Sequence, residues 1–276
     1  MPAASEIFAP DLLDGRVVLV TGGGTNLGLH AAIELHRAGA TVVIAGRREE
    51  VLVEAAPRVG ERCTVAQGDV RDADSARAIV ERVIADHGRL DVLVNNAGGQ
   101  YFVPALDIVA KGWRAVWRLN VEGTRTMTRA AVEGGFGPDG GTVVNITVSP
   151  HRGYPGMAHT GAARAAVEEL TRSQAQEWAA SGVAVVAAAI GRFDTESLRK
   201  YPDVVYRGAA ASVPLQRLGT MDEFAWLVTL LASPLGRDLS GSVVTLDGAL
   251  DNWEGAWPRE TLLDEQGEVP TEERRG

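Results

Sequence analysis

The chain has 276 residues, and its 45% hydrophobic and 23% charged residues are typical of a globular protein with a substantial core. Its formal net charge is −9, and residues 251–276 alone hold eight acidic and three basic side chains. The sequence offers no basic block for neutralising nucleic-acid phosphates and no apolar run of the roughly 18 residues that a membrane span requires. We therefore expect neither a nucleic-acid nor a membrane partner.

Cysteine usage and the first residues bear on the cellular compartment. Cys63 is the one cysteine in the sequence, which excludes an internal disulfide. The opening MPAASEIFAPDLLDG has neither the basic nor the apolar region of a secretory signal. His, Cys and carboxylate residues are not spaced as metal ligands, so we expect no metal. These features predict a cytoplasmic protein with a small-molecule substrate.

Taken in chain order, short β-branched runs alternate with longer segments of helical periodicity. The expected strands are residues 17–20, 41–45, 63–67, 91–95, 142–146, 183–190 and 242–246. The expected helices are residues 27–38, 48–58, 73–87, 106–133, 158–181, 196–210 and 221–233. The glycine-rich stretch 134–141 predicts a loop.

The expected strands are apolar at both odd and even positions, which indicates burial on both faces and hence a parallel sheet between two layers of helices. We predict a doubly wound α/β fold with a parallel seven-stranded sheet. No repeat or linker divides the chain, so a single domain is expected over residues 16–250. It follows an N-terminal arm (1–15) and precedes an acidic tail (251–276), whose Trp253 and Trp257 are expected to dock.

A glycine-rich turn connects the first expected strand to the first expected helix. Glycines allow close backbone approach, and the N-terminus of a helix attracts a pyrophosphate, so the position favours dinucleotide binding over a purely structural turn. Asparagine stands where a middle glycine is expected, but asparagine tolerates left-handed backbone geometry. The residues assigned to this phosphate loop are Gly22, Thr25, Asn26, Leu27 and Gly28.

Arg47 and Arg48 follow the second expected strand, where an NAD enzyme would carry a carboxylate for the adenosine ribose. Guanidinium groups form charge-assisted hydrogen bonds with phosphate, so the pair favours the 2′-phosphate of NADP(H). The alternative is that both side chains are simply solvated at the start of a helix.

Four motifs in order resemble the short-chain dehydrogenase/reductase family: TGGGTNLG at 21–28, Gly68-Asp69-Val70, Asn95-Asn96-Ala97-Gly98 and Asn120-Val121. The resemblance spans residues 12–250 and implies a Rossmann fold. It further implies that Asp69 and Val70 flank the adenine, that Asn96, Ala97 and Gly98 line the path of the cofactor, and that Gly191 and Thr195 face the nicotinamide. For Asp69, capping of the next helix is the alternative.

The family's reactive Ser, Tyr and Lys fall by spacing on Thr147, Thr160 and Arg164. A threonine hydroxyl is too weakly acidic to replace the tyrosine, and arginine can bind ribose hydroxyls without relaying a proton, so ordinary alcohol dehydrogenation is not expected. Thr147 is expected to donate to a substrate carbonyl, with strand propensity as the alternative. By resemblance Asn120 orders a water; a solvent-facing side chain is the alternative.

Residues 95–105, 112–116 and 159–164 resemble peroxisomal trans-2-enoyl-CoA and dienoyl-CoA reductases, which carry a small hydroxyl at the tyrosine position. Reduction of a conjugated double bond needs hydrogen-bond donors for an enolate rather than a strong acid. We expect an NADP(H)-dependent oxidoreductase that reduces an α,β-unsaturated acyl thioester or carbonyl compound. The alternative is a degenerate fold with a non-redox or cofactor-sensing role.

Further side chains near these motifs are candidates for other roles. His159 and Tyr154 are candidate replacement acids, with packing as the alternative for each. Glu168 and Glu169 are neighbours on a helix and are expected at the surface. Trp113 and Trp117 are expected in a core or a subunit interface, and by resemblance the helices at 106–133 and 158–181 form a homodimer or homotetramer. Four basic residues could meet a carrier phosphate, although solvation is favoured: Arg192, Arg199, Lys200 and Arg207.

Overall fold

The computed structural model describes residues 5–149, 151–200 and 203–252. At its centre lies one seven-stranded sheet in the order β3-β2-β1-β4-β5-β6-β7, and every pair of neighbouring strands is parallel. The strands are β1 (Val17–Thr21), β2 (Thr41–Gly46), β3 (Cys63–Gln67), β4 (Val92–Asn95), β5 (Gly141–Val148), β6 (Val183–Ile190) and β7 (Val243–Leu246). The predicted fold class and all seven predicted strands are confirmed.

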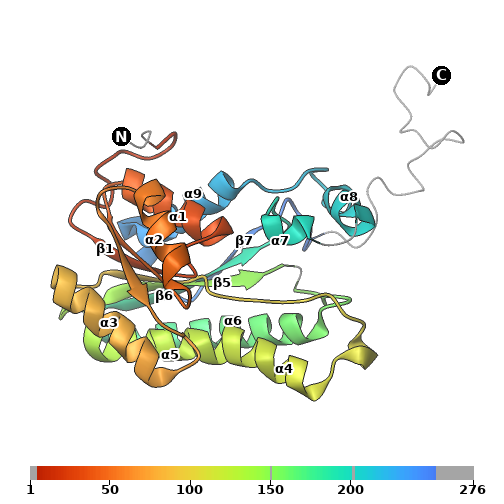
Figure 1. The fold of residues 1–276 in the computed structure, drawn as a ribbon, viewed down its shortest axis with the longest axis horizontal. Coiled ribbons are helices and arrows are strands. Elements are labelled where there is room, and N and C mark those ends of the chain that lie inside the picture. Colours follow the sequence, from red (N-terminus) through yellow and green to blue (C-terminus); the bar gives the residue numbers. More distant parts are fainter. Residues whose placement is uncertain (1–4, 150, 201–202, 253–276) are drawn as a thin grey trace, which may run out of the picture.

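Helices cover both faces of the sheet (Figure 1). On one face lie α1 (Asn26–Arg37), α2 (Glu49–Val59) and α9 (Met221–Ala232), and on the other α3 (Ala73–His87), α5 (Gly123–Ala130) and α6 (Ala158–Trp178). Each layer encloses its own apolar cluster, with Leu35 and Phe224 buried in the first and Ile79 and Met127 in the second. Because the sheet is buried on both faces, the strands are apolar at both odd and even positions.

Local capping fixes where several helices begin. The carboxylate of Asp72 accepts a hydrogen bond from the Ser75 backbone N–H and so caps α3. Thr220 and Glu223 form a reciprocal capping box at the start of α9. The remaining short elements are η1 (Ala105–Asp107), α7 (Glu196–Arg199), α8 (Asp203–Ala211), η4 (Ala179–Ser181) and α10 (Pro234–Arg237).

Two predicted helices differ from the structure. The helix expected over 106–133 begins only with α4 (Ala110–Trp117) and continues through two π-helical stretches, η2 (Arg118–Glu122) and η3 (Ala131–Gly135), so the predicted loop at 134–141 is shorter. The helix expected over 196–210 is divided into α7 and α8. Pro202 stands between them in the sequence, and proline lacks the N–H that a continuous helix requires.

The N-terminal segment packs onto the domain. Leu13 is 1% exposed, and its backbone N–H donates to the Ala38 carbonyl at 2.7 Å. Of the predicted acidic tail, Asp251 and Asn252 are described, and the predicted docking of Trp253 and Trp257 lies outside the described residues. Among the helices that are described, none combines the length and the apolar character needed to cross a bilayer.

Candidate functional site

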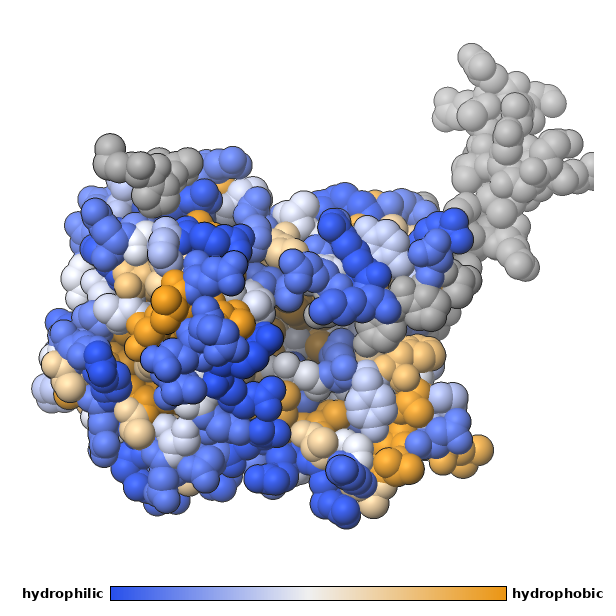
Figure 2. Space-filling view, in the orientation of Figure 1, coloured by the Kyte–Doolittle hydropathy of each residue, from blue (hydrophilic) through white to orange (hydrophobic). Residues whose placement is uncertain are grey.

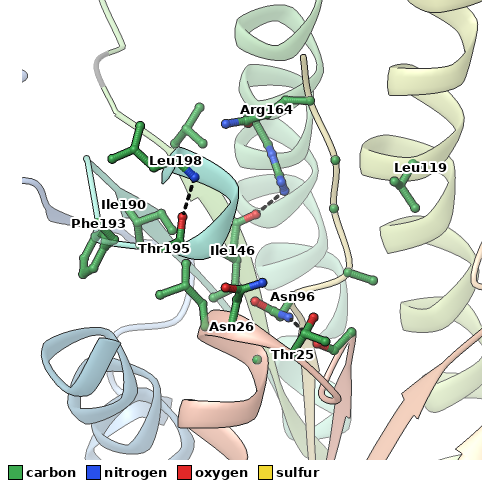
Figure 3. A pocket seen from close by; sticks show the side chains of 18 of the residues that line it. Thr25, Asn26, Asn96, Leu119, Ile146, Arg164, Ile190, Phe193, Thr195 and Leu198 are labelled. Carbon is green, nitrogen blue, oxygen red and sulfur yellow. Dashed lines mark hydrogen bonds between the residues drawn. The ribbon is translucent and has the colours of Figure 1, made fainter. Parts of the chain in front are cut away.

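A cavity of about 640 Å³ opens at the carboxyl ends of β1, β2, β4, β5 and β6. This edge is where ligands bind in open α/β sheets, at the point where the strand order reverses. Figure 2 shows the surface hollowed between the α7–α8 segment and the helices of the opposite layer. Figure 3 shows side chains from both halves of the chain converging there.

The glycine turn forms one wall of the cavity. Gly22 and Asn26 both adopt positive φ, +65° and +46°, so asparagine does occupy the left-handed conformation that the sequence suggested. Thr25 precedes α1 without a side-chain cap, which leaves the first N–H groups of the helix without that partner. A Cβ on Gly28 would lie 2.3 Å from the Gly22 carbonyl oxygen. The turn is thus a tight backbone cradle at a helix N-terminus, a geometry suited to a phosphate.

Asn96 joins the end of β4 to this turn. Its side-chain amide donates to the carbonyl oxygens of Thr21 (2.9 Å) and Gly22 (3.3 Å). In return the Thr21 hydroxyl accepts hydrogen bonds from the backbone N–H groups of Asn96 and Ala97. The predicted Asn96-Ala97-Gly98 segment therefore lines the cavity and also holds the cradle in shape.

At the far end of the cavity lie the exposed Arg47 and Arg48, together with Asp69 and Val70. Asp69 does not cap the following helix: it accepts bidentate hydrogen bonds from Arg71, and Asp72 provides the cap. The Arg71 hydrogen bond lowers the pKa of Asp69 against the effect of burial, and the Arg47 charge adds to it. This end of the cavity thus combines Arg47 and Arg48 with a carboxylate that is paired to Arg71.

Gly191 and Thr195 lie on the opposite wall, after β6. The Thr195 hydroxyl accepts a hydrogen bond from the Leu198 N–H at 3.1 Å (Figure 3), which closes the turn into α7. The Asn26 side-chain oxygen accepts one from the Glu196 N–H at 3.2 Å. The glycine turn is therefore hydrogen-bonded directly to the segment that borders the other side of the cavity.

Arg164 is a buried cation, 7% exposed, on the first turns of α6. It donates to the Ile146 carbonyl at 2.6 Å (Figure 3), and its Nε has no hydrogen-bond partner among the described residues. Burial lowers its pKa to about 10. A Cβ on Gly98 would lie 2.3 Å from the guanidinium, so glycine is required for this approach. Nε is itself buried, so contact with a ligand in the cavity falls to the other atoms of the guanidinium.

Asn120 lies in the π-helical stretch η2 and is fully buried. Its amide donates to the carbonyl oxygens of Gly99 and Val116, each at 2.8 Å, and its oxygen accepts from the Gly99 N–H at 3.2 Å. Both N–H groups of the side chain are thus engaged. Any further ligand of Asn120 has to be a donor to its oxygen.

The two threonines of the predicted catalytic set are both fully buried, but they differ in position. Thr147 borders the cavity, and its hydroxyl donates to Oε1 of Glu168 at 2.9 Å. Thr160 is fully buried, is absent from the residues that line the cavity, and its hydroxyl has no partner among the described residues. The structure therefore brings Thr147 and Arg164 to the cavity but sets Thr160 behind it.

The prediction that Glu168 lies at the surface is wrong, because the residue is 4% exposed, whereas the Glu169 side chain is 70% exposed. Oε1 of Glu168 accepts from Thr147 and also lies 2.9 Å from Nε2 of His151. The signal was present in the sequence: Glu168 follows Arg164 by four residues, which places both on one face of the helix. Sequence reasoning also missed His151, since its position in a loop gives no periodicity.

The other candidate acids take different surroundings. His159 is buried and packs edge-on against the Tyr101 ring, with centroids 4.5 Å apart, and burial lowers its pKa so that the neutral form is favoured. Tyr154 lines the cavity.

The two tryptophans lie apart from this site. Trp113 is 40% exposed on α4, and Trp117 packs against the apolar cluster between α4 and α6. Within the described ranges no group of three His, Cys, Asp or Glu residues is arranged to hold a metal ion.

Comparison with known proteins agrees with this geometry. Residues 23–250 match the family described as Enoyl-(Acyl carrier protein) reductase. Over 261 residues the chain is 35% identical to the peroxisomal 2,4-dienoyl-CoA reductase of Danio rerio, covering 92% of this chain and 85% of the relative. It is also 31% identical over 242 residues to a 3-oxoacyl-(acyl-carrier-protein) reductase of Thermotoga maritima, covering 86% and 98% of the two chains.

Among solved structures, a citronellol catabolism dehydrogenase of Pseudomonas aeruginosa PAO1 superimposes with a TM-score of 0.80 at 35% identity, covering 89% of this chain and 98% of that one. The likeness thus extends over nearly the whole length of the chain. On this ground the chain belongs to the short-chain dehydrogenase/reductase family of oxidoreductases.

Proposed function

We propose that the protein is an NADP(H)-dependent reductase of a conjugated carbon–carbon double bond, acting on an α,β-unsaturated acyl thioester or carbonyl compound. The observation that carries this proposal is the pair of residues at the family's tyrosine and lysine positions. These are Thr160, buried behind the cavity, and Arg164, buried beside it. Neither is suited to protonating an alkoxide, whereas reduction of a double bond places its negative charge on a carbonyl oxygen that hydrogen-bond donors can stabilise.

The residues of the cavity fit a nicotinamide dinucleotide. The backbone cradle of Gly22 and Gly28 is tight enough that a Cβ on Gly28 would collide with backbone, and it lies at the start of α1. Arg47 and Arg48 line the same cavity, and their guanidinium groups are suited to a 2′-phosphate, which supports NADP(H) over NAD(H). Asp69 and Val70 would border the adenine, and Gly191 and Thr195 the nicotinamide. When bound, the reduced cofactor supplies a hydride.

The remaining roles concern the reacting end of the cavity. The guanidinium of Arg164 would hold the ribose hydroxyls, in place of the family's ammonium. Thr147 would donate to the carbonyl oxygen on which charge gathers, and Asn120 would accept a hydrogen bond from an ordered water. Thr160 would contribute to catalysis only indirectly, because it does not line the cavity. Relatives named as dienoyl-CoA and acyl-carrier-protein reductases support an acyl thioester as the substrate class.

The experiment is a titration with NADPH and with NADH, followed by nicotinamide fluorescence and thermal stabilisation. We expect tight binding of NADPH and weak binding of NADH. The bound complex is then mixed with trans-2-hexenoyl-CoA and with 2,4-hexadienoyl-CoA, and oxidation of NADPH is followed at 340 nm. Binding without turnover across a broad panel of acceptors would favour the alternative, a cofactor-sensing protein on a degenerate fold. Lack of binding to either cofactor would refute both.

We further propose that the protein is a homodimer or homotetramer that works in the cytoplasm. Support for assembly comes from α4, where the half-exposed Trp113 and its neighbour Trp117 border a surface hollow of about 370 Å³. Burial of such aromatic surface stabilises subunit contacts. Light scattering on the purified protein and on Trp113→Arg tests this, since a monomeric wild type would refute it. Cell fractionation tests the compartment.

A further inference from the structure

Four side chains form a continuous hydrogen-bonded chain from the cavity to the surface, which we call the Glu168 network: Thr147, Glu168, His151 and Asp251. Thr147 donates to Oε1 of Glu168 at 2.9 Å, and the same oxygen lies 2.9 Å from Nε2 of His151. The other ring nitrogen of His151 is hydrogen-bonded to Asp251, whose second oxygen accepts from the His151 backbone N–H at 2.6 Å. Thr147 borders the cavity, and the His151 side chain is 33% exposed.

The surroundings of His151 favour its charged form. Burial alone would lower its pKa, but the Asp251 hydrogen bond and the Glu168 charge outweigh burial and raise the pKa above the usual value. Two other cations lie nearby: Arg152 beside Asp251, and Arg172, 3.9 Å from the second oxygen of Glu168. Asp247 faces the same segment and accepts from the Asp251 N–H at 2.7 Å. A carboxylate thus lies at hydrogen-bond distance from each ring nitrogen, an arrangement that favours a hydrogen on both.

In this arrangement the hydroxyl of Thr147 can donate its hydrogen either to Glu168 or to a ligand in the cavity. A threonine hydroxyl has one hydrogen to donate, and in the structure Glu168 receives it. While Glu168 is ionised, Thr147 therefore cannot donate to a ligand in the cavity as well. If Oε1 of Glu168 carries a proton, the direction of this hydrogen bond reverses, and the hydrogen of Thr147 is released.

We propose that His151 and Glu168 are positioning residues that supply a proton to Thr147, so that Thr147 donates to the substrate oxygen only when the network holds that proton. This inference rests on the function proposed above. It assigns the proton donor that the loss of the family's tyrosine leaves open.

The transfer balances in protons and charge. As hydride adds to the β carbon, the electron pair of the double bond moves toward the carbonyl and leaves an enolate oxygen. That oxygen takes the hydrogen of Thr147, the threonine oxygen takes one from Glu168, and Glu168 takes one from Nε2 of His151. His151 is left neutral and is protonated again from solvent, to which a third of its side chain is exposed. The enol then becomes the saturated thioester in solvent.

The first test does not depend on turnover. The pKa of each histidine ring is measured by NMR in the wild type, with the His151 signal assigned by its loss in His151→Gln. We expect Glu168→Gln to lower the pKa of His151 by about one unit, because an opposite charge at contact distance is removed. Glu169→Gln is the matched control, since it removes the neighbouring exposed carboxylate. A His151 titration unchanged in Glu168→Gln would overturn the inference.

The second test is the pH profile of kcat with trans-2-hexenoyl-CoA and saturating NADPH. The wild-type rate should fall as the pH rises through the raised pKa of His151, because the protonated ring is the donor. Glu168→Gln and Thr147→Val should lose about 100-fold in kcat, and Glu168→Gln should lose that pH dependence, with partial rescue in Glu168→Asp. NADPH binding in each variant reports whether the fold is intact.

The outcomes separate the two proposals. If the wild type binds NADPH but reduces no enoyl thioester, the proposed function fails. If the wild type is active and Glu168→Gln keeps both its rate and its pH profile, the relay fails alone. A structural role for Glu168 would instead lower the melting temperature or raise KM and leave the shape of the pH profile unchanged.

Discussion

Gly28→Ala tests the phosphate cradle most directly. The added Cβ would lie 2.3 Å from the Gly22 carbonyl oxygen and 2.5 Å from the Asn96 side-chain nitrogen, whereas real Cβ atoms essentially never approach closer than 3.0 Å. The Gly22 carbonyl must therefore retreat by about 0.7 Å, and Asn96 resists because it is hydrogen-bonded to the Thr21 carbonyl oxygen at 2.9 Å. Overpacking against backbone of this kind costs about 2–3 kcal/mol.

For a domain of this size, that cost corresponds to a fall of roughly 5–10 °C in Tm. The displaced carbonyl also narrows the cradle, so we expect the Kd for NADPH to rise at least about tenfold, or about 1.4 kcal/mol. Differential scanning calorimetry and fluorescence titration measure the two effects. Gly134→Ala is the matched control, because its Cβ would meet nothing within 4 Å. Gly28→Ala with the Tm and NADPH affinity of the wild type would refute this reading of the turn.

Three further predictions concern single side chains. Asn26→Gly should keep the stability of the wild type within about 0.5 kcal/mol, whereas Asn26→Val should lose about 1–2 kcal/mol in urea unfolding, because a β-branched residue strains the φ of +46°. Equal losses in both would show that the hydrogen bond to the Glu196 N–H matters more than the backbone. The Arg47→Ser, Arg48→Ser double variant should weaken NADPH binding by about tenfold or more and leave NADH binding unchanged; a parallel loss for both cofactors would refute the 2′-phosphate assignment. Arg217 and the Thr220 cap hold the pKa of Glu223 at about 2, below its unfolded value of about 4.3, so its contribution to stability is present above pH 4.3 and is lost as the pH falls toward 2. The difference in unfolding free energy between wild type and Glu223→Gln should therefore be smaller at pH 3 than at pH 7.

The fold could be predicted from the sequence because its signals are local and repeated. Each buried strand is a short β-branched run. The glycine turn consists of consecutive residues, so it predicts the first strand-to-helix connection from the sequence alone. Asn26 even showed its left-handed conformation through its residue type. The long helix was less predictable, because the π-helical stretch around Asn120 depends on hydrogen bonds to Gly99, a contact that crosses elements.

The site was predicted where its residues follow strands directly, and less well where contacts are distant. Thr147 could be placed at the end of a strand, but its partner Glu168 lies 21 residues away in the sequence. Glu168 was expected at the surface because only its relation to the neighbouring Glu169 was considered, and not the helix face that it shares with Arg164. Arg71 was missed because its pairing with Asp69 is a matter of side-chain direction rather than of spacing. The contact between His151 and Asp251 spans 100 residues and leaves no periodic trace.

The contact between His151 and Asp251 also has a consequence for the order in which the protein assembles during synthesis. Synthesis runs from the N-terminus, so the phosphate turn, β1 and β2 leave the ribosome long before β6, β7 and Asp251. Because β6 pairs with β5 along its whole length and β7 closes the far edge, the loop that carries His151 meets its carboxylate only after nearly the entire chain has emerged. A chain that ends before Asp251 would therefore leave Nδ1 of His151 without its carboxylate, and the Glu168 network would be incomplete.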